Sequence, residues 1–151
     1  RMVFDVAHGQ MVLFGGDATD AGGSLGDTWL FRDDVWQPAA TQRAPSPRFS
    51  LSFAYDEARG VVVAFGGRGP GITHGDTWEF DGAVWRERAL ATHPPVRQDQ
   101  LMAYDAASRR MVMFSGYGDN GLLDDLWAYD GTAWSELVQA NHPVVRWLAG
   151  S

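Results

Sequence analysis

The sequence contains no cysteine, which removes several kinds of chemistry at once. Without thiols the chain forms neither disulfides nor thiolate metal sites, and it has no thiol nucleophile. No apolar run approaches the roughly 18–20 residues that a membrane-spanning helix needs, and the first residues lack the charged and apolar regions of a secretory signal. We therefore expect a soluble protein without a membrane partner, whose compartment the sequence leaves open.

Basic residues are also scarce. Twelve Lys and Arg stand against 19 Asp and Glu, which gives a formal net charge of -7 and a pI near 4.8. This balance argues against nucleic acid as the main partner, because phosphate backbones are bound by positive charge. Bulky residues are plentiful, with seven Trp, eight Phe and four Tyr in 151 residues, which is enough for the core of one ordinary domain.

One phrase of eleven residues recurs three times along the chain. It reads GDTWLFRDDVW at 26–36, GDTWEFDGAVW at 75–85 and DDLWAYDGTAW at 124–134. Three series of residues keep a spacing of 49, namely Trp29, Trp78 and Trp127; Trp36, Trp85 and Trp134; and Arg48, Arg97 and Arg146. A constant spacing of several residue types through three copies does not arise by chance. The sequence therefore predicts an internal repeat of about 49 residues, with a two-residue insertion in the first copy.

Each copy is expected to contain four strands and no helix. An alternating first strand (48–56 or 97–105) precedes a near-continuous apolar strand that ends in FGG or FSG. A third strand follows the variable loop, and Asp-Gly at 81–82 and 130–131 marks a hairpin. The fourth strand is short and carries Trp85 or Trp134.

The glycine pair after an apolar strand, the Trp that follows and the later Trp resemble the kelch motif. The GDTW form is similar to kelch domains of bacterial proteins, which are related in fold to the galactose oxidase propeller. The resemblance covers essentially the whole chain and implies an all-β fold of kelch-type β-propeller blades, three in this chain, each a four-stranded antiparallel sheet. Galactose oxidase needs copper and a cysteine-linked tyrosine, so its activity does not transfer to this cysteine-free chain.

Most of the repeated residues are expected to serve the structure. The glycines allow positive φ and close backbone approach, and because Ser115 replaces the first glycine in the third copy, the second position is expected to be the strained one. The later tryptophans are expected to fill the wedge between blades, and the aspartates to accept backbone hydrogen bonds where the variable loops end. These structural residues are Gly15, Gly16, Gly66, Gly67, Gly116, Trp29, Trp78, Trp127, Trp36, Trp85, Trp134, Asp27, Asp76 and Asp125.

Three blades do not close a ring, because propellers typically have four to eight. The residues RWLAGS at 146–151 match the beginning of a first strand, and RMVFD at 1–5 match the end of one. We expect residues 1–151 to form a single half-propeller, and two chains to close a six-bladed ring as a homodimer by sharing this broken strand. The alternatives are a fragment of a longer propeller, and an engineered or relict half-propeller that only self-assembles.

Arg48, Arg97 and Arg146 begin the first strands and share a face with the most variable loops, 17–26, 68–75 and 117–124. Several kelch domains bind acidic peptides with arginines at similar points of the repeat. By that resemblance we expect a non-catalytic binding module that takes a protein segment or other anionic ligand beside these arginines. In the alternative interpretation, each arginine pairs with a carboxylate or carbonyl of its own blade or the next.

Catalytic and metal-binding patterns are lacking. His93 and His142 lie one period apart, each before a proline, without a histidine or carboxylate at ligand spacing. No nucleophile–base set, phosphate loop or dinucleotide fingerprint is present. We expect no cofactor, no metal and no catalytic residue. The rival function is an enzyme acting on a carbohydrate or small acid in the axial pocket, for which carboxylates converging beside the arginines would be the sign.

Overall fold

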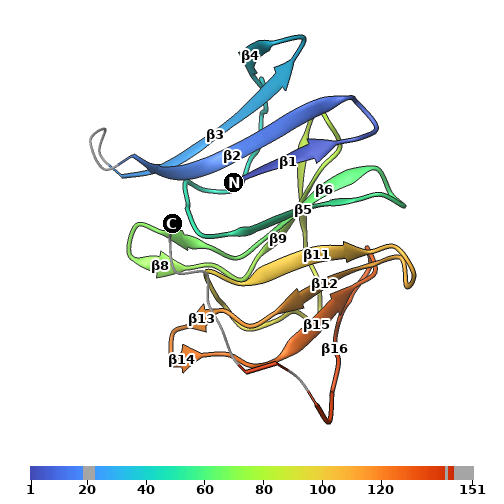
Figure 1. Cartoon of the computed structure of the whole chain (residues 1–151). Coiled ribbons are helices and arrows are strands. Elements are labelled where there is room, and N and C mark those ends of the chain that lie inside the picture. The colour runs from blue at the N-terminus through green and yellow to red at the C-terminus, as the bar shows by residue number, and fades with distance from the viewer. Residues whose placement is uncertain (19–22, 142, 145–151) are drawn as a thin grey trace.

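The computed structural model of the chain describes residues 1–18, 23–141 and 143–144. These residues form strands and turns, and no helix is found among them. Three sheets of four strands follow one another along the chain, and Figure 1 shows them layered in chain order, from blue through green to orange. Every pairing within them is antiparallel, so the expected all-β fold of four-stranded antiparallel sheets is confirmed.

We call the sheets the first, second and third blade. The first blade, in the order β1-β2-β3-β4, consists of Met2–Asp5, Gln10–Ala18, Gly23–Arg32 and Val35–Pro38. The second, in the order β5-β6-β9-β10, consists of Ser52–Asp56, Val61–Phe65, Thr77–Phe80 and Trp85–Arg88. The third, in the order β11-β12-β15-β16, consists of Leu101–Asp105, Arg110–Phe114, Leu126–Tyr129 and Trp134–Glu136.

Two of the connections expected as loops form short hairpins of their own. Strand β7 (Arg68–Gly69) pairs with β8 (Ile72–Thr73), and β13 (Tyr117–Gly118) pairs with β14 (Gly121–Leu122). In the first blade, β2 and β3 extend past a bulge and pair out to Ala18 and Gly23. The three connections lie at the same end of the blades, on the left of Figure 1. We call residues 17–18, 23–26, 68–75 and 117–124 the loop face.

Each blade has two different faces, which the strand register defines because directly opposite residues share a face. One face of the second blade carries the row Tyr55, Val62, Phe80 and Trp85, and we call this kind of face, which holds the fourth-strand tryptophan, the Trp face. The reverse side carries the opposed pair Phe65 and Thr77. We call it the Phe face. The corresponding Trp-face rows are Phe4, Met11, Phe31 and Trp36 in the first blade and Tyr104, Met111, Tyr129 and Trp134 in the third.

The hydrophobic core lies between blades. The Phe face of the first blade packs on the Trp face of the second, and the Phe face of the second packs on the Trp face of the third. The fully buried residues of these two layers include Val12, Phe14, Val62, Phe80, Val63, Phe65, Met111, Met113, Tyr129 and Trp134. The inner strands are neighbours too, since β1 contacts β5 and β5 contacts β11. A blade is therefore stabilised chiefly by the blades beside it, as in other repeat architectures.

The glycine pairs that end each second strand have left-handed backbones. At the second position φ is 138° for Gly16, 97° for Gly67 and 118° for Gly116, and values this large are essentially restricted to glycine. At the first position Ser115 has a φ of 63°, which a non-glycine residue tolerates. By its backbone angles, the second position is the one that requires glycine more strongly.

The first position of the pair is restricted by a close contact with the backbone of the next repeat. A Cβ on Gly66 would lie 2.5 Å from the carbonyl oxygen of Arg97. We expect Gly66→Ala to lower the free energy of unfolding by about 3 kcal/mol, because the new methyl group forces the two backbones apart. Gly71→Ala is the control: its φ of 73° is similar, but no atom lies within 4 Å of the added Cβ. Denaturant unfolding of both variants measures the difference, and equal losses would contradict the contact argument.

Candidate functional site

Arg48 lies buried at the end of its own blade. Its Nη1 and Nη2 donate to Oδ1 and Oδ2 of Asp76 at 2.5 and 3.0 Å, while Nη1 also donates to the carbonyl of Gly66 at 3.1 Å. Nε donates to the carbonyl of Ser46 at 3.0 Å. The side chain is only 2% exposed. This bidentate geometry is the strongest form of an arginine–carboxylate pair.

Arg97 repeats the arrangement one blade further on. Its Nη1 and Nη2 donate to Oδ1 and Oδ2 of Asp125 at 2.5 and 2.7 Å, and Nη1 donates to the carbonyl of Ser115 at 3.1 Å. Nε donates to the carbonyl of Pro95 at 3.0 Å. The side chain is 0% exposed. The third repeated arginine, Arg146, lies outside the described residues.

The main chain of each of these arginines is attached to the blade before. Gly16 N donates to Arg48 O at 3.0 Å and Arg48 N donates to Leu25 O at 2.9 Å, so the backbone of Arg48 joins the first blade while its side chain holds the second. Arg97 likewise receives a hydrogen bond from Gly67 N at 2.8 Å. Each arginine therefore ties two consecutive blades together.

The two aspartates are held as anions by these contacts. Burial acts to raise the pKa of Asp76 and Asp125, but the hydrogen bonds and charge of Arg48 and Arg97 outweigh it, and both values lie below the ordinary 3.8. The positive charge of each arginine is thus neutralised inside the protein. This is the arrangement of the alternative interpretation, in which the arginine pairs within its own blade.

The carboxylates of the repeated aspartates accept hydrogen bonds from side chains. The sequence had predicted backbone amides as their donors. Besides the arginines, Trp78 Nε1 donates to Asp76 and Trp127 Nε1 donates to Asp125, both at 2.7 Å. Asp27 accepts a hydrogen bond from Trp29 Nε1 at 2.5 Å. Asp27 differs from the other two, because among the described residues no arginine pairs with it.

The fourth-strand tryptophans of the second and third blades occupy matching positions on the preceding Phe face. Trp85 meets the ring of Phe14 edge-on with 5.4 Å between centroids, and its Nε1 donates to Thr28 Oγ1 at 3.0 Å. Trp134 meets Phe65 at 5.3 Å and donates to Thr77 Oγ1 at 2.9 Å. These two tryptophans pack between consecutive blades. The role of these threonines was not predicted from the sequence, although each stands one residue before a repeated tryptophan.

Among the described residues, a charged cluster lies between the second and third blades and has no counterpart between the first and second. Glu79 accepts hydrogen bonds from Tyr129 Oη at 2.8 Å, from Arg59 and from Arg88 at 3.3 Å. Arg59 also donates to Asp56 at 2.9 Å and lies 5.1 Å from the ring centroid of Tyr129. Burial, followed by the charge of Glu79, raises the pKa of Tyr129. Because Leu30 and Ala128 occupy the place of Glu79 in the other blades, the repeat gave no sign of this cluster.

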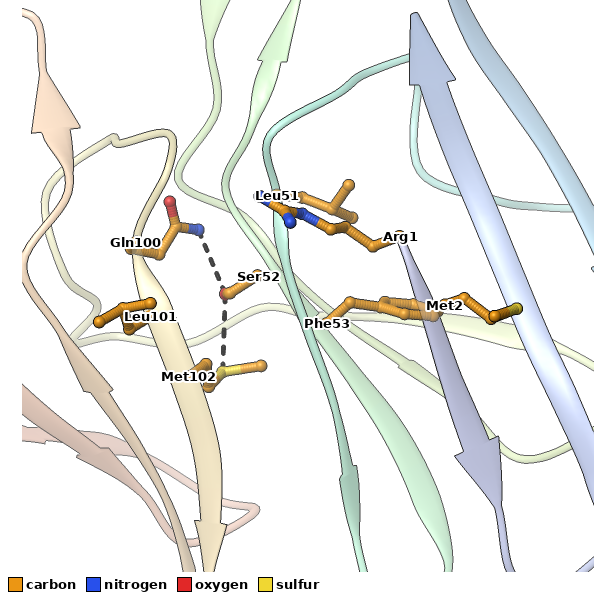
Figure 2. Close-up of a pocket in the computed structure, with 8 residues that line it drawn as sticks. All are labelled: Arg1, Met2, Leu51, Ser52, Phe53, Gln100, Leu101 and Met102. Carbon is orange, nitrogen blue, oxygen red and sulfur yellow. Dashed lines mark hydrogen bonds between the residues drawn. The ribbon is translucent and has the colours of Figure 1, made fainter. Parts of the chain in front are cut away.

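A hollow of about 230 Å³ opens where the three inner strands come together (Figure 2). Gln100, the residue before β11, donates hydrogen bonds to Ser52 Oγ at 3.2 Å and to Phe65 O at 2.7 Å. Ser52 Oγ in turn contacts Met102 Sδ. The remaining lining residues are Arg1, Met2, Leu51, Phe53 and Leu101. Among the described residues that line this hollow there is no carboxylate.

Two further searches cover the part of the chain that the structure describes. There, no group of three or more His, Asp or Glu side chains has the geometry to hold a metal ion. No helix there is long and apolar enough to cross a membrane.

The repeated sheets of four antiparallel strands are consistent with kelch blades. The family model described as the KLHDC2/KLHL20/DRC7 Kelch-repeats domain matches residues 2–146. The chain belongs to the kelch-repeat family. Kelch-repeat domains are generally non-catalytic modules that bind other proteins. A comparison with individually curated proteins gives no match.

Proposed function

We propose that this kelch domain binds a protein segment on its loop face, without catalysis. The observation that carries the proposal is a set of large apolar side chains exposed on three consecutive connections. Leu25 belongs to the first, Ile72 to the second, and Tyr117 and Leu122 to the third. Exposed apolar side chains gathered on one face are typical of interaction sites, and variable loops on a rigid scaffold are where binding residues concentrate.

The charges of the loop face favour a basic partner segment. Its described residues expose Asp17, Asp119 and Asp124 against a single exposed cation, Arg68. Burial, followed by the charge of Arg48, lowers the pKa of His74, so this side chain adds no positive charge near pH 7. The repeated arginines add none either, because Arg48 and Arg97 are buried against aspartates. The segment is therefore expected to combine apolar side chains with Lys or Arg.

A random peptide library displayed on phage tests this proposal. Selection on the wild-type chain should enrich peptides that contain Lys or Arg beside aromatic or aliphatic residues. The double variant Ile72→Ser and Leu122→Ser should lose at least about tenfold in affinity for a selected peptide, because each side chain contributes apolar contact area. Val84→Ser is the matched control, since Val84 is exposed in the connection between β9 and β10, at the opposite end of the blade. Enrichment of acidic peptides, or of none over an unrelated protein, would contradict the proposal.

We also propose that two chains assemble into a six-bladed ring, in which residues 146–151 of each complete the first strand of the other. The support is the exposed Trp face of the first blade, where Met2, Phe4 and Trp36 are open to solvent. The equivalent face of the second blade is buried in the core. An uncovered face of this kind is a strong drive for association. Sedimentation should therefore give twice the chain mass of 16.6 kDa, and a stable folded monomer at all concentrations would contradict the ring.

A further inference from the structure

His74 is a residue of the loop face that breaks the repeat. It is separated by 49 residues from both Leu25 and Leu123, which hold the same place in the other copies. In the first blade, Arg48 N donates to Leu25 O at 2.9 Å. In the second, Arg97 N donates to His74 O at 3.1 Å, so the main chain has the same role. A leucine is thus sufficient for the fold at this position, and the imidazole of the second blade adds a group that titrates near neutral pH.

The imidazole of His74 packs on the β7–β8 hairpin and on the connection that arrives from the first blade. A Cβ added to Gly69 would lie 2.8 Å from His74 Nε2, so the ring covers this glycine. Nε2 also lies 3.4 Å from Ser46 Oγ in the connection. In the third blade Leu123 covers Gly118 in the same way. The side chain is half-buried, so it is held in place while part of it still reaches the surface of the loop face.

Two charged groups act on this ring, one from each side of the sequence. Burial and the charge of Arg48 lower the pKa of His74 below its ordinary value of 6.5, and the charge of Asp76 acts in the opposite direction. On β7 the residue that faces the ring is the glycine, so Arg68 points to the opposite face of the hairpin, because successive residues of a strand alternate. Arg97, whose main chain contacts His74, is neutralised by its own aspartate. His74 is therefore neutral near pH 7 and gains a proton in mildly acidic solution.

The imidazole shares a face of the hairpin with Ile72, the exposed apolar residue that the second blade contributes to the proposed binding site. Ile72 and Gly69 are directly opposite in the β7–β8 register. His74 N donates to Gly67 O at 2.8 Å, which continues the pairing beyond β8. Because His74 follows Ile72 by two residues, the two side chains are on the same face and start about 7 Å apart. A charge on His74 would lie beside any segment that contacts Ile72.

We propose that His74 makes the binding of a basic segment to the loop face dependent on pH. This inference rests on the proposed function, because it concerns how binding at that same face is regulated. Neutral His74 leaves the negative charge of the loop face unopposed beside Ile72, and a segment with Lys or Arg binds. Protonation places a positive charge next to the segment, and the like charges weaken the complex. The complex should therefore form near neutral pH and dissociate more readily at mildly acidic pH.

Fluorescence anisotropy of a labelled peptide tests this pH dependence. The probe is a peptide from the phage selection that contains Lys or Arg, resynthesised without any group that titrates between about pH 5 and pH 7.5. Across that range its dissociation constant should rise about fivefold more on the wild type than on His74→Leu, because like charges about 7 Å apart near a surface repel with an effect of this order. His74→Leu should fold, since leucine stands at this position in the other two copies, and circular dichroism at both ends of the range checks it. His8→Gln, in the β1–β2 turn at the opposite end of the blades, is the control and should keep the wild-type response.

A second peptide, in which each Lys or Arg is replaced by Gln, separates charge repulsion from a change in the hairpin. Its affinity for the wild type should be nearly independent of pH, because it carries no charge for His74 to repel. Equal weakening of both peptides in acid, or an equal pH response of the wild type and His74→Leu, would overturn the role of His74 while leaving binding at the loop face standing. If no basic peptide binds the wild type, the proposed function and this inference both fail.

Discussion

Replacing Arg97 with methionine is expected to lower the free energy of unfolding by about 3–5 kcal/mol. Methionine keeps the length and the apolar stem of the side chain but removes all its donors. The carboxylate of Asp125 would then stay largely buried without its cation, and the carbonyls of Pro95 and Ser115 would lose their donor. Removing one partner of a buried pair costs far more than the pair itself contributes, because the remaining charge has no solvation.

Denaturant unfolding at fixed protein concentration measures the loss. Arg86→Met is the control, because Arg86 pairs with Asp81 on the surface and is 59% exposed; exposed pairs of this kind are worth at most about 1 kcal/mol. A loss for Arg97→Met no larger than for the control would contradict the tie between blades.

The pH dependence of the same comparison separates charge from packing. In the wild type, Arg97 holds the pKa of Asp125 below its ordinary value of 3.8 despite burial, so this carboxylate stabilises the fold above about pH 4 and the contribution is lost as the pH falls through the folded pKa. In Arg97→Met the burial of Asp125 is no longer opposed by the arginine, and the hydrogen bond from Trp127 is the side-chain contact that still favours the anion, so the pKa rises relative to the wild type and the charged form becomes less favourable. The deficit of the variant should therefore be largest near pH 7 and shrink below pH 4. A deficit independent of pH would indicate lost packing instead.

The architecture could be predicted from the sequence because the strongest signals are periodic. Trp29, Trp78 and Trp127 mark the third strand of each sheet, and the structure places all three on strands of that rank. The apolar second strands are internal in their sheets, and β6 of the second blade, which has a blade on either side, is buried on both faces, as its unbroken apolar run predicts. The sequence pattern did not predict the hairpins β7–β8 and β13–β14. Each of their strands has two residues, which is too short to show a periodic pattern.

The roles of the site residues were harder to predict, because a repeat shows that a residue type is needed without showing what it contacts. Arg48 and Arg97 fitted both a ligand site and an internal pair, and only the positions of Asp76 and Asp125 distinguish the two. The fixed offset of 28 residues from each arginine to its aspartate was present in the sequence. An offset becomes a contact only when the blade twist and the loop length between the two residues are known.

Residues that break the repeat carry the remaining information. Glu79 has no counterpart in the other blades. It makes the contact between the second and third blades chemically different from the contact between the first and second. Its cluster pairs two carboxylates with two guanidinium groups, and buried pairs of this kind can specify which surfaces associate. We expect the cluster to help keep the blades in their order, because the third blade fits the second through Tyr129, whose place in the second blade is taken by Phe80.

Trp134→Ala is expected to cost about 3–5 kcal/mol of unfolding free energy, as truncation of a fully buried aromatic side chain does. Trp134 is 2% exposed, stacks on Tyr129 at 5.0 Å and meets Phe65 of the blade before. Thr77→Val isolates the hydrogen bond. It preserves the shape of the side chain, leaves the Trp134 N–H unpaired and should cost about 1–3 kcal/mol. Fluorescence-detected denaturant unfolding measures both changes.

The same truncation at Trp36 should weaken the association of chains and have little effect on the unfolding free energy of one chain. Trp36 belongs to the same repeat position, yet it is exposed and contacts no neighbouring blade within the described part of the chain. Trp36→Ala should therefore leave the unfolding of a dilute protomer nearly unchanged and appear instead as weaker association. If Trp36→Ala cost as much unfolding free energy as Trp134→Ala at every concentration, the tryptophans would stabilise their own blades, and contact between blades would not be their main role. If Trp134→Ala is costly and Trp36→Ala is not, packing between blades supplies most of the unfolding free energy of this fold. The proposed association that covers the first blade would then add one more interface of the same kind.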